Sequence, residues 1–142
     1  MQVENILQSK GRTVHTLPAG ATIAEAVELL NSRRIGAVVV TGDKGRVAGI
    51  LSERDIVRHL GTDWQSLAGR TVSEVMTKDV VTMSRRASVA EVMERMTERR
   101  IRHLPIVDNG ELVGIVSIGD VVKRKIEETE QEALALKEYI AS

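Results

Sequence analysis

Two segments of this chain carry the same sequence pattern at a nearly constant separation. Arg-Arg-Ile at 33–35 returns as Arg-Arg-Ile at 99–101. Further on, Ser-Glu-Arg-Asp at 52–55 matches Ser-Ile-Gly-Asp at 117–120, with one residue fewer between the matched positions, lost at a turn. A fixed period with a single deletion at a turn indicates an internal duplication. The fold is therefore expected to consist of two copies of one unit.

Each copy has the signals of strand, helix, strand, strand and helix, in that order. In the second copy, apolar runs flank Asp-Asn-Gly at 108–110, which predicts a hairpin because Asn and Gly tolerate positive φ. The expected strands are 14–17, 36–41, 46–51, 80–83, 104–107 and 112–116, and the expected helices are 1–9, 22–34, 52–60 and 71–76, with two more beginning at 88 and 118. One copy is too small to close a core alone, so an α+β fold with the two copies packed through their sheets is expected.

The boundaries of this organisation follow from where the periodic patterns stop. The sequence predicts a first repeat with an N-terminal helix over 1–60, a linker without periodicity over 61–70, a second repeat over 71–122, and a C-terminal helical tail over 123–142. Six residues of the last helix fall at alternating spacings of four and three, which is a heptad seam: Val122, Ile126, Thr129, Ala133, Leu136 and Ile140. Both an amphipathic helix lying on its own domain and a helix-to-helix dimer contact are consistent with this pattern.

Composition narrows the functional classes. Lys plus Arg and Asp plus Glu number 20 each, so no global field attracts nucleic acid or an anionic membrane. Trp64 and Tyr139 are the only aromatic residues, which argues against stacking of single-stranded bases. With no cysteine, no signal peptide and no long apolar run, the expectation is a cytoplasmic protein without a membrane span.

The repeated Ser-x-x-Asp pattern has two interpretations. Each copy follows an expected strand and opens an expected helix, where Ser and Asp commonly cap free backbone N–H groups. The same geometry would also suit a ligand, because a helix start attracts phosphate and an Asp one turn in accepts ribose hydroxyls. Duplication would preserve either role, so both stay open.

Arg102 and His103 stand where the first copy has only Gly36 and Ala37. A charged side chain on the core face of a strand is costly unless it is paired, and a phosphate would pair it. The alternative is that Arg102 faces solvent and His103 is a satisfied interior histidine. Catalysis has little support, because the sequence shows no metal-ligand spacing, nucleophile motif or phosphate loop.

The repeat resembles a known family. The segments that carry the resemblance are 75–82 (Val-Met-Thr-Lys-Asp-Val-Val-Thr), 100–108 (Arg-Ile-Arg-His-Leu-Pro-Ile-Val-Asp), 114–120 (Gly-Ile-Val-Ser-Ile-Gly-Asp) and, in the first copy, 49–55 (Gly-Ile-Leu-Ser-Glu-Arg-Asp). Together they resemble tandem CBS (cystathionine beta-synthase) domains, and the chain looks like a stand-alone pair, or Bateman module. The resemblance implies two clefts related by a pseudo-twofold axis that bind adenosine compounds such as AMP, ADP, ATP, NAD or S-adenosylmethionine. It also implies a homodimer.

The family pattern assigns the ligand contacts residue by residue, with each cleft built from both repeats. One cleft would combine Ser52, Arg54, Asp55, Thr77, Lys78, Val80, Arg102, His103, Leu104 and Pro105. The other would combine Ser117, Gly119, Asp120, Arg12, Val14, Ala37 and Val38. Because the first repeat lacks the Arg-His pair, the cleft of Asp55 is expected to bind phosphate better.

The function that follows is regulatory rather than enzymatic. The resemblance implies a module that senses energy or redox state by binding an adenine nucleotide, with no catalytic residues and no metal. The ligand would change the repeat or dimer interface, and a regulated protein that the sequence does not identify would respond to that change. The alternative is a ligand-independent dimerisation or assembly protein, and an enzyme acting on a nucleotide phosphoester is a weaker possibility.

Overall fold

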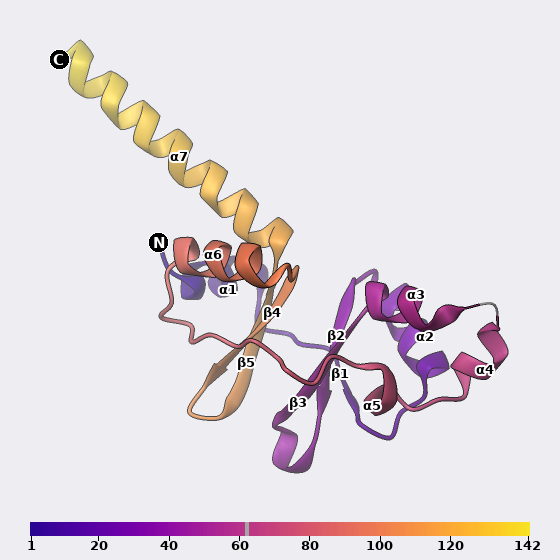
Figure 1. Ribbon diagram of the computed structural model, residues 1–142. Coiled ribbons are helices and arrows are strands. Elements are labelled where there is room, and N and C mark those ends of the chain that lie inside the picture. Colours follow the sequence, from indigo (N-terminus) through magenta and orange to yellow (C-terminus); the bar gives the residue numbers. More distant parts are fainter. Residues whose placement is uncertain (62) are drawn as a thin grey trace. The chain divides into compact units, whose positions relative to one another are not determined.

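The computed structural model describes residues 1–61 and 63–142, which form two compact units (Figure 1). Unit 1 comprises Met1–Arg12, Thr82–Asp108 and Val113–Ser142, and unit 2 comprises Thr13–Val81 and Asn109–Leu112. The elements follow in the order α1 (Val3–Lys10), β1 (Thr16–Pro18), α2 (Ile23–Arg33), β2 (Ala37–Thr41), a 3-10 turn η1 (Asp43–Gly45), β3 (Val47–Ser52), α3 (Glu53–Leu60), α4 (Trp64–Ala68), α5 (Val72–Val75), α6 (Val89–Arg99), β4 (His103–Asp108), β5 (Glu111–Ser117) and α7 (Ile118–Ala141). The expected α+β character is confirmed.

Unit 2 contains a three-stranded sheet in the order β1, β2, β3, whose strands are labelled in Figure 1. β1 pairs with β2 in parallel, so the chain has to cross over between them, and α2 provides that crossover. β2 then pairs with β3 in antiparallel fashion across η1, with Val39 opposite Ile50. α3 begins directly after β3. The strand, helix, strand, strand, helix order expected for the first repeat is confirmed.

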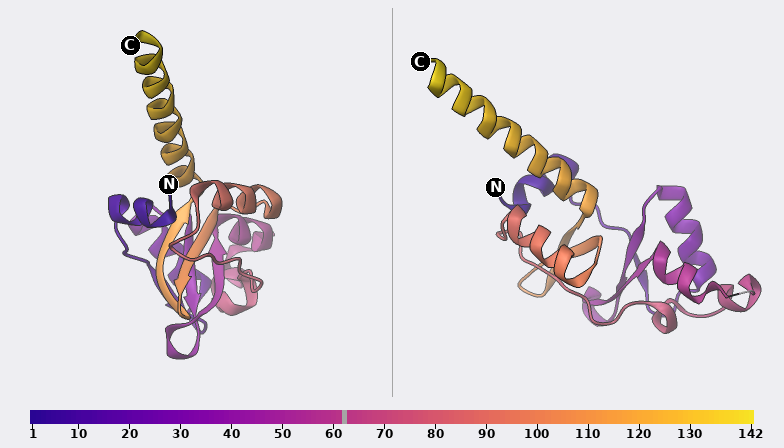
Figure 2. Two further views of the ribbon diagram at one scale, coloured as in Figure 1. Left: turned by 90° about the vertical axis from the view of Figure 1, so that its left-hand side faces the viewer. Right: turned by 45° about the horizontal axis from the view of Figure 1, so that its top comes forward.

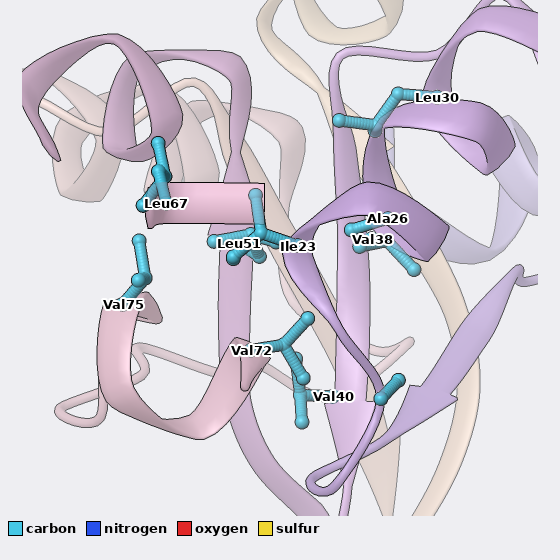
Figure 3. Close-up of a cluster of buried hydrophobic side chains, with 10 residues drawn as sticks. Ile23, Ala26, Leu30, Val38, Val40, Leu51, Leu67, Val72 and Val75 are labelled. Carbon is cyan, nitrogen blue, oxygen red and sulfur yellow. The ribbon is translucent and has the colours of Figure 1, made fainter. Parts of the chain in front are cut away.

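The core of unit 2 lies between α2 and one face of this sheet (Figure 3). The Thr22 hydroxyl caps α2 by accepting a hydrogen bond from the Glu25 backbone N–H at 3.2 Å, as the sequence predicts. Val38 and Val40 are two residues apart in β2 and therefore point to the same face of the sheet. The buried cluster consists of Ala21, Ile23, Ala26, Leu30, Val38, Val40, Leu51, Leu67, Val72 and Val75. The aliphatic core expected from the composition is thus observed.

The segment 61–70, expected to be a linker, contains the short helix α4. Asp63 caps it by accepting from the Ser66 backbone N–H at 3.3 Å, and Leu67 is buried in the core of unit 2. A helix of five residues has too few turns to show a periodic pattern, so no helix is predicted there. Thr62, which belongs to the same expected linker, lies outside the described residues.

Unit 1 contains β4, the part of β5 that follows Leu112, and the helices α1, α6 and α7, whereas the tip of the β4–β5 hairpin, residues 109–112, belongs to unit 2. The hairpin turns at Asn109 and Gly110, whose φ angles are 50° and 78°, so the predicted turn is confirmed. Ser88 caps α6 by accepting from the Glu91 backbone N–H at 3.0 Å. The order α6, β4, β5, α7 in the second repeat therefore matches the order α2, β2, β3, α3 in the first.

The prediction of a strand at 80–83 is wrong. Only Met83 pairs, in a single parallel bridge with Ile106, where the Val107 N–H donates to the Met83 carbonyl at 2.9 Å. This bridge repeats the register of Leu17 opposite Val40 in β1 and β2. Val80 and Val81 belong to unit 2, whereas Thr82 and Met83 belong to unit 1 with β4, so the predicted strand spans the boundary between the units.

The short helix at the start of each repeat packs with the body of the other repeat. α1 belongs to unit 1, where its N-cap residue Gln2 bridges Ser88, the N-cap residue of α6. α5 belongs to unit 2, where its N-cap residue Thr71 bridges Thr22, the N-cap residue of α2. The Thr71 hydroxyl does not cap α5 but donates to the Glu74 carboxylate at 3.1 Å. Both helices are thus exchanged in the same way.

Glycine allows both exchanged segments to approach a strand closely. A Cβ built on Gly49 of β3 would lie 2.9 Å from the Thr77 carbonyl oxygen, and one on Gly114 of β5 would lie 2.6 Å from a methyl carbon of Leu7. These distances are shorter than a real Cβ tolerates. The two glycines occupy matching positions of the repeat, just ahead of the two Ser-x-x-Asp segments. Each therefore positions the exchanged segment beside a candidate site.

α7 continues beyond the part that packs in unit 1. Its first turns contact α1 and α6, and Val121 is fully buried. From Thr129 to Ser142 every residue is exposed, so the interpretation of the tail as a helix lying on its own domain is wrong for this part. Within the described residues, no helix is long and apolar enough to cross a membrane.

Candidate functional site

Asp55 lies in the first turn of α3, immediately after β3. Its Oδ2 accepts hydrogen bonds from the Ser52 backbone N–H at 2.9 Å and from the Ser52 hydroxyl at 3.1 Å, and the Asp55 N–H bonds the Ser52 Oγ at 3.2 Å. This is a reciprocal capping box, so the capping interpretation of Ser-x-x-Asp is confirmed here. Asp55 is only 8% exposed, a low value for a carboxylate at a helix start.

Thr77 of the exchanged segment reaches this carboxylate. The Thr77 backbone pairs with Ile50 of β3 through two hydrogen bonds of 2.9 and 3.0 Å, which hold the segment alongside the strand. From there the Thr77 hydroxyl donates to Asp55 Oδ1 at 3.3 Å. Both oxygens of Asp55 thus accept from hydroxyl groups, and Thr77 lies beside Ser52 and Asp55.

Asp120 holds the matching position at the start of α7. Its Oδ2 accepts from the Ser117 backbone N–H at 2.9 Å, and the Asp120 N–H bonds the Ser117 Oγ at 3.2 Å, which completes the same capping box. The partner from the exchanged segment differs, because Lys10 of α1 donates to Asp120 Oδ2 at 2.6 Å and to the Ile115 carbonyl at 3.0 Å. Asp120 therefore faces a cation where Asp55 faces a neutral hydroxyl.

Lys10 changes the electrostatics of the Asp120 position. Burial acts to raise the pKa of Asp120, but the hydrogen bond from Lys10 and those from Ser117 outweigh it and lower the pKa below its usual range. A hollow beside this ion pair is lined by α1 and α7, with Lys123 and Arg124 among its walls. Arg124 also donates to the Asn5 carbonyl at 2.9 Å and so ties α1 to α7. The charge near Asp120 is thus compensated from within the protein.

Replacing Lys10 by methionine tests this compensation. In Lys10→Met the pKa of Asp120 is expected to rise, because burial then acts against fewer hydrogen bonds. A lowered pKa stabilises the fold above the unfolded-state pKa, and this stabilisation disappears as pH falls through the folded-state pKa. The variant should therefore lose stability at a higher pH than the parent. Carboxyl NMR titration measures the pKa directly, with Lys123→Met as the control, and equal Asp120 pKa values in both variants would contradict the assignment.

The contact of Lys10 with Asp120 is the feature that the sequence interpretation missed. The family pattern pointed two residues further on, to Arg12, which pairs instead with Glu4 in unit 1. The repeat alignment offered a signal, since it matches the residues around Lys10 with those around Thr77. The alignment does not show, however, that α1 and α5 each pack with the other repeat, so it does not predict which Asp each segment contacts.

The expected site residues are divided between the units. Unit 2 holds Ser52, Arg54, Asp55, Thr77, Lys78, Val80, Val14, Ala37 and Val38. Unit 1 holds Ser117, Gly119, Asp120, Arg12, Arg102, His103, Leu104 and Pro105. The structure brings Ser52, Asp55 and Thr77 together in unit 2, and Ser117, Asp120 and Lys10 in unit 1. The completion of each cleft by residues of the other unit stays a prediction.

The segment before β4 shows how Arg102 and His103 are placed. Arg102 is exposed, and its carbonyl accepts a hydrogen bond from the Ile118 N–H at 2.8 Å, which fixes the start of α7. His103 is half-buried, while Leu104 and Pro105 are buried. Within the described part of the chain, no group of three or more His, Cys, Asp or Glu residues could hold a metal ion.

Comparison with known proteins identifies the family. A CBS domain family model matches the chain twice, over residues 6–62 and 72–127. The chain belongs to the CBS-domain family. The two matches coincide with the two repeats, so this is a tandem CBS pair.

Several relatives of this CBS pair are known. The mitochondrial CBS domain-containing protein CBSX3 of Arabidopsis thaliana is 31% identical, over 97% of this chain and 71% of its own length. The crystal structure of the CBS-domain protein ATU1752 from Agrobacterium tumefaciens is 43% identical with a TM-score of 0.83, covering 87% of this chain and 92% of that one. A third structure, the CBS pair of MJ0100, contains 5-methylthioadenosine and S-adenosyl-L-methionine. It is 26% identical with a TM-score of 0.79, covering 90% of this chain and 98% of that one.

Proposed function

We propose that this CBS pair is a regulatory module that binds an adenosine compound through its two Ser-x-x-Asp helix starts. The observation that carries the proposal is the buried Asp55 carboxylate, whose oxygens both accept hydrogen bonds from hydroxyl groups of Ser52 and Thr77. A ribose offers two further hydroxyl donors of the same kind. The adenosine ligands bound by the MJ0100 pair support this chemistry.

The phosphate groups of a nucleotide would need positive charge near Asp55. Lys78 follows Thr77 directly and Arg54 precedes Asp55, so both cations lie next to residues of the carboxylate site. We expect Arg102 and His103 to complete this cleft, as in the family pattern. The cleft of Asp55 is then the better phosphate site, and AMP, ADP, ATP or NAD would be preferred there over an uncharged nucleoside.

Regulation requires that the ligand favour one arrangement of the module over another. A ligand can shift such an equilibrium only by its difference in affinity for the two states, commonly about 1 to 3 kcal/mol. We propose that ligand binding changes the interface between the repeats or between two copies in a homodimer, and that a regulated protein recognises the change. No catalytic step is part of this function, and the cysteine-free sequence favours a cytoplasmic setting.

Calorimetric titration tests the proposal directly. The purified chain is titrated separately with AMP, ADP, ATP, NAD and S-adenosylmethionine, and saturable heat is expected with at least one of them. The same titrations with adenosine and with inorganic phosphate show whether the ribose or the charge provides more of the affinity. If none of the five compounds gives saturable heat or raises the melting temperature, the ligand-binding proposal is wrong.

A second candidate function is ligand-independent assembly. The exposed apolar residues along α7 favour it, because they offer a surface for another chain without any nucleotide. An unchanged oligomeric mass with and without ligand, measured by light scattering, together with no detectable ligand binding, would favour this alternative.

A further inference from the structure

The outer part of α7 exposes large apolar side chains. Ile126 is 53% exposed, Leu136 is 58% exposed and Ile140 is 74% exposed. Figures 1 and 2 show this part of the helix extending away from α1 and α6, its neighbours in unit 1. An isolated helical segment of this length is only marginally stable in water, so its stability depends on packing. An exposed apolar surface of this kind is typical of a site that binds another protein chain.

Five apolar residues and one threonine form a stripe along α7. This seam consists of Val122, Ile126, Thr129, Ala133, Leu136 and Ile140. Its spacing of four and three places these residues at alternating d and a positions of a heptad, where two helices pack against each other. Val121 and Arg124, which pack in unit 1, lie outside the seam. The helix can therefore keep its place in unit 1 while the seam binds a second helix.

Charges beside the seam show which helix fits. The g positions carry Lys125 and Glu132, and the e positions five residues further on carry Glu130 and Lys137. In a parallel pair of helices each g residue meets the e residue five positions later on the partner. Both of these g–e pairs, Lys125 with Glu130 and Glu132 with Lys137, then bring opposite charges together. Within its own helix, Lys125 lies 3.8 Å from Glu128, a long and partly exposed ion pair that contributes little.

The antiparallel arrangement of the same seam brings like charges together. When Val122 lies opposite Ile140, each Glu130 faces the Glu130 of the other helix, and each Glu132 faces the other Glu132. Lys123 would then face Lys137. We propose that α7 pairs with α7 of a second copy of this chain as a parallel, in-register coiled coil. This inference goes beyond the proposed function, since it requires no ligand.

A single cysteine at the end of α7 distinguishes the two orientations. The chain has no cysteine of its own, so Ser142→Cys introduces a unique thiol. In a parallel pair the two helix ends lie about 10 Å apart or less, the usual distance between packed helices. In the antiparallel register, residue 142 of each copy lies eleven residues from the midpoint at 131, which separates the thiols by roughly 33 Å at 1.5 Å per residue.

The expected result is a disulfide-linked dimer when Ser142→Cys is treated with diamide in the absence of nucleotide, detected on a non-reducing gel. In this background Lys125→Glu should slow cross-linking roughly fivefold, because it places Glu opposite Glu130. Lys125→Glu combined with Glu130→Lys should restore the parent rate. Glu138→Lys, at a position facing away from the seam, makes a comparable charge change and should leave the rate unaltered.

Two outcomes would overturn the proposal. One is the absence of cross-linked dimer in Ser142→Cys at concentrations where light scattering shows a dimer. The other is equal slowing by Lys125→Glu and Glu138→Lys, which would mean that the seam charges do not meet. Circular dichroism checks that each variant keeps its helix content. Calorimetric titration of Ser142→Cys with nucleotide is independent of cross-linking, so a failure of the ligand proposal remains distinguishable from a failure of this one.

Discussion

Gly49→Ala is expected to destabilise the protein by about 1 to 3 kcal/mol, the usual cost of forcing extra volume into a packed site. The added methyl group would lie 2.9 Å from the Thr77 carbonyl oxygen and would also collide with the Met76 side chain. Met76 is flexible and can move, but the Thr77 carbonyl is held by its hydrogen bond from Ile50. The exchanged segment would have to leave β3, so the Thr77 contact with Asp55 would also be lost. Urea unfolding measures the change in stability.

Gly20→Ala is the matched control for this prediction. Gly20 has open space around its ideal Cβ position and its φ lies outside the left-handed region, so an alanine there meets no obstacle. It should leave the unfolding midpoint unchanged or raise it slightly, because alanine restricts the unfolded chain. Equal midpoints for Gly49→Ala and Gly20→Ala would show that the 76–77 segment does not need close contact with β3.

Asp55→Asn is expected to weaken nucleotide binding roughly 10- to 100-fold, which corresponds to the loss of about 1.5 to 3 kcal/mol for a hydrogen bond to a charged group. Asparagine keeps one oxygen for the cap of α3, so the helix start should survive. What it loses is the charge and one of the two acceptor oxygens that receive the hydroxyls of Ser52 and Thr77. Calorimetric titration with the tightest-binding compound measures the effect.

Asp63→Asn is a suitable control, since Asp63 caps α4 in the same unit but is exposed. It should retain the parent affinity. Asp120→Asn tests the matching position in unit 1. Because Lys10 already donates to Oδ2 of Asp120, the change in nucleotide affinity should differ between backgrounds with and without Lys10. If Asp55→Asn binds nucleotide as tightly as Asp63→Asn does, Asp55 is only a capping residue.

Local signals predicted most of the elements. Thr22 and Ser88 cap the helices where the sequence places them, and Asn109 with Gly110 forms the expected turn. These features depend on a few neighbouring residues, so the sequence alone identifies them. The strand expected at 80–83 failed for a different reason. The segment is apolar, as a strand would be, but it spans the boundary between the two units. Within it, only Met83 pairs with another strand.

Long-range contacts could not be predicted in the same way. Nothing local to Lys10 shows that it would reach Asp120, because that pairing depends on α1 packing in the unit of the second repeat. The helix α4 was missed because it is short and is anchored by one buried residue, Leu67. The assignment of Arg102 and His103 to the cleft of Asp55 rests on the family pattern and is still a prediction.

The exchange of α1 and α5 also affects how the chain can fold as it is synthesised. α1 is synthesised before unit 2, yet Val3, Ile6 and Leu7 are buried in a unit whose remaining residues begin at Thr82. Unit 2, apart from the four residues 109–112, is complete once Val81 has left the ribosome, so it can form early. The first helix must wait for almost the whole chain, and closing so long a loop slows folding. Until then the apolar face of α1 has no partner to pack against, so the segment that stands first in the fold order is among the last to be buried.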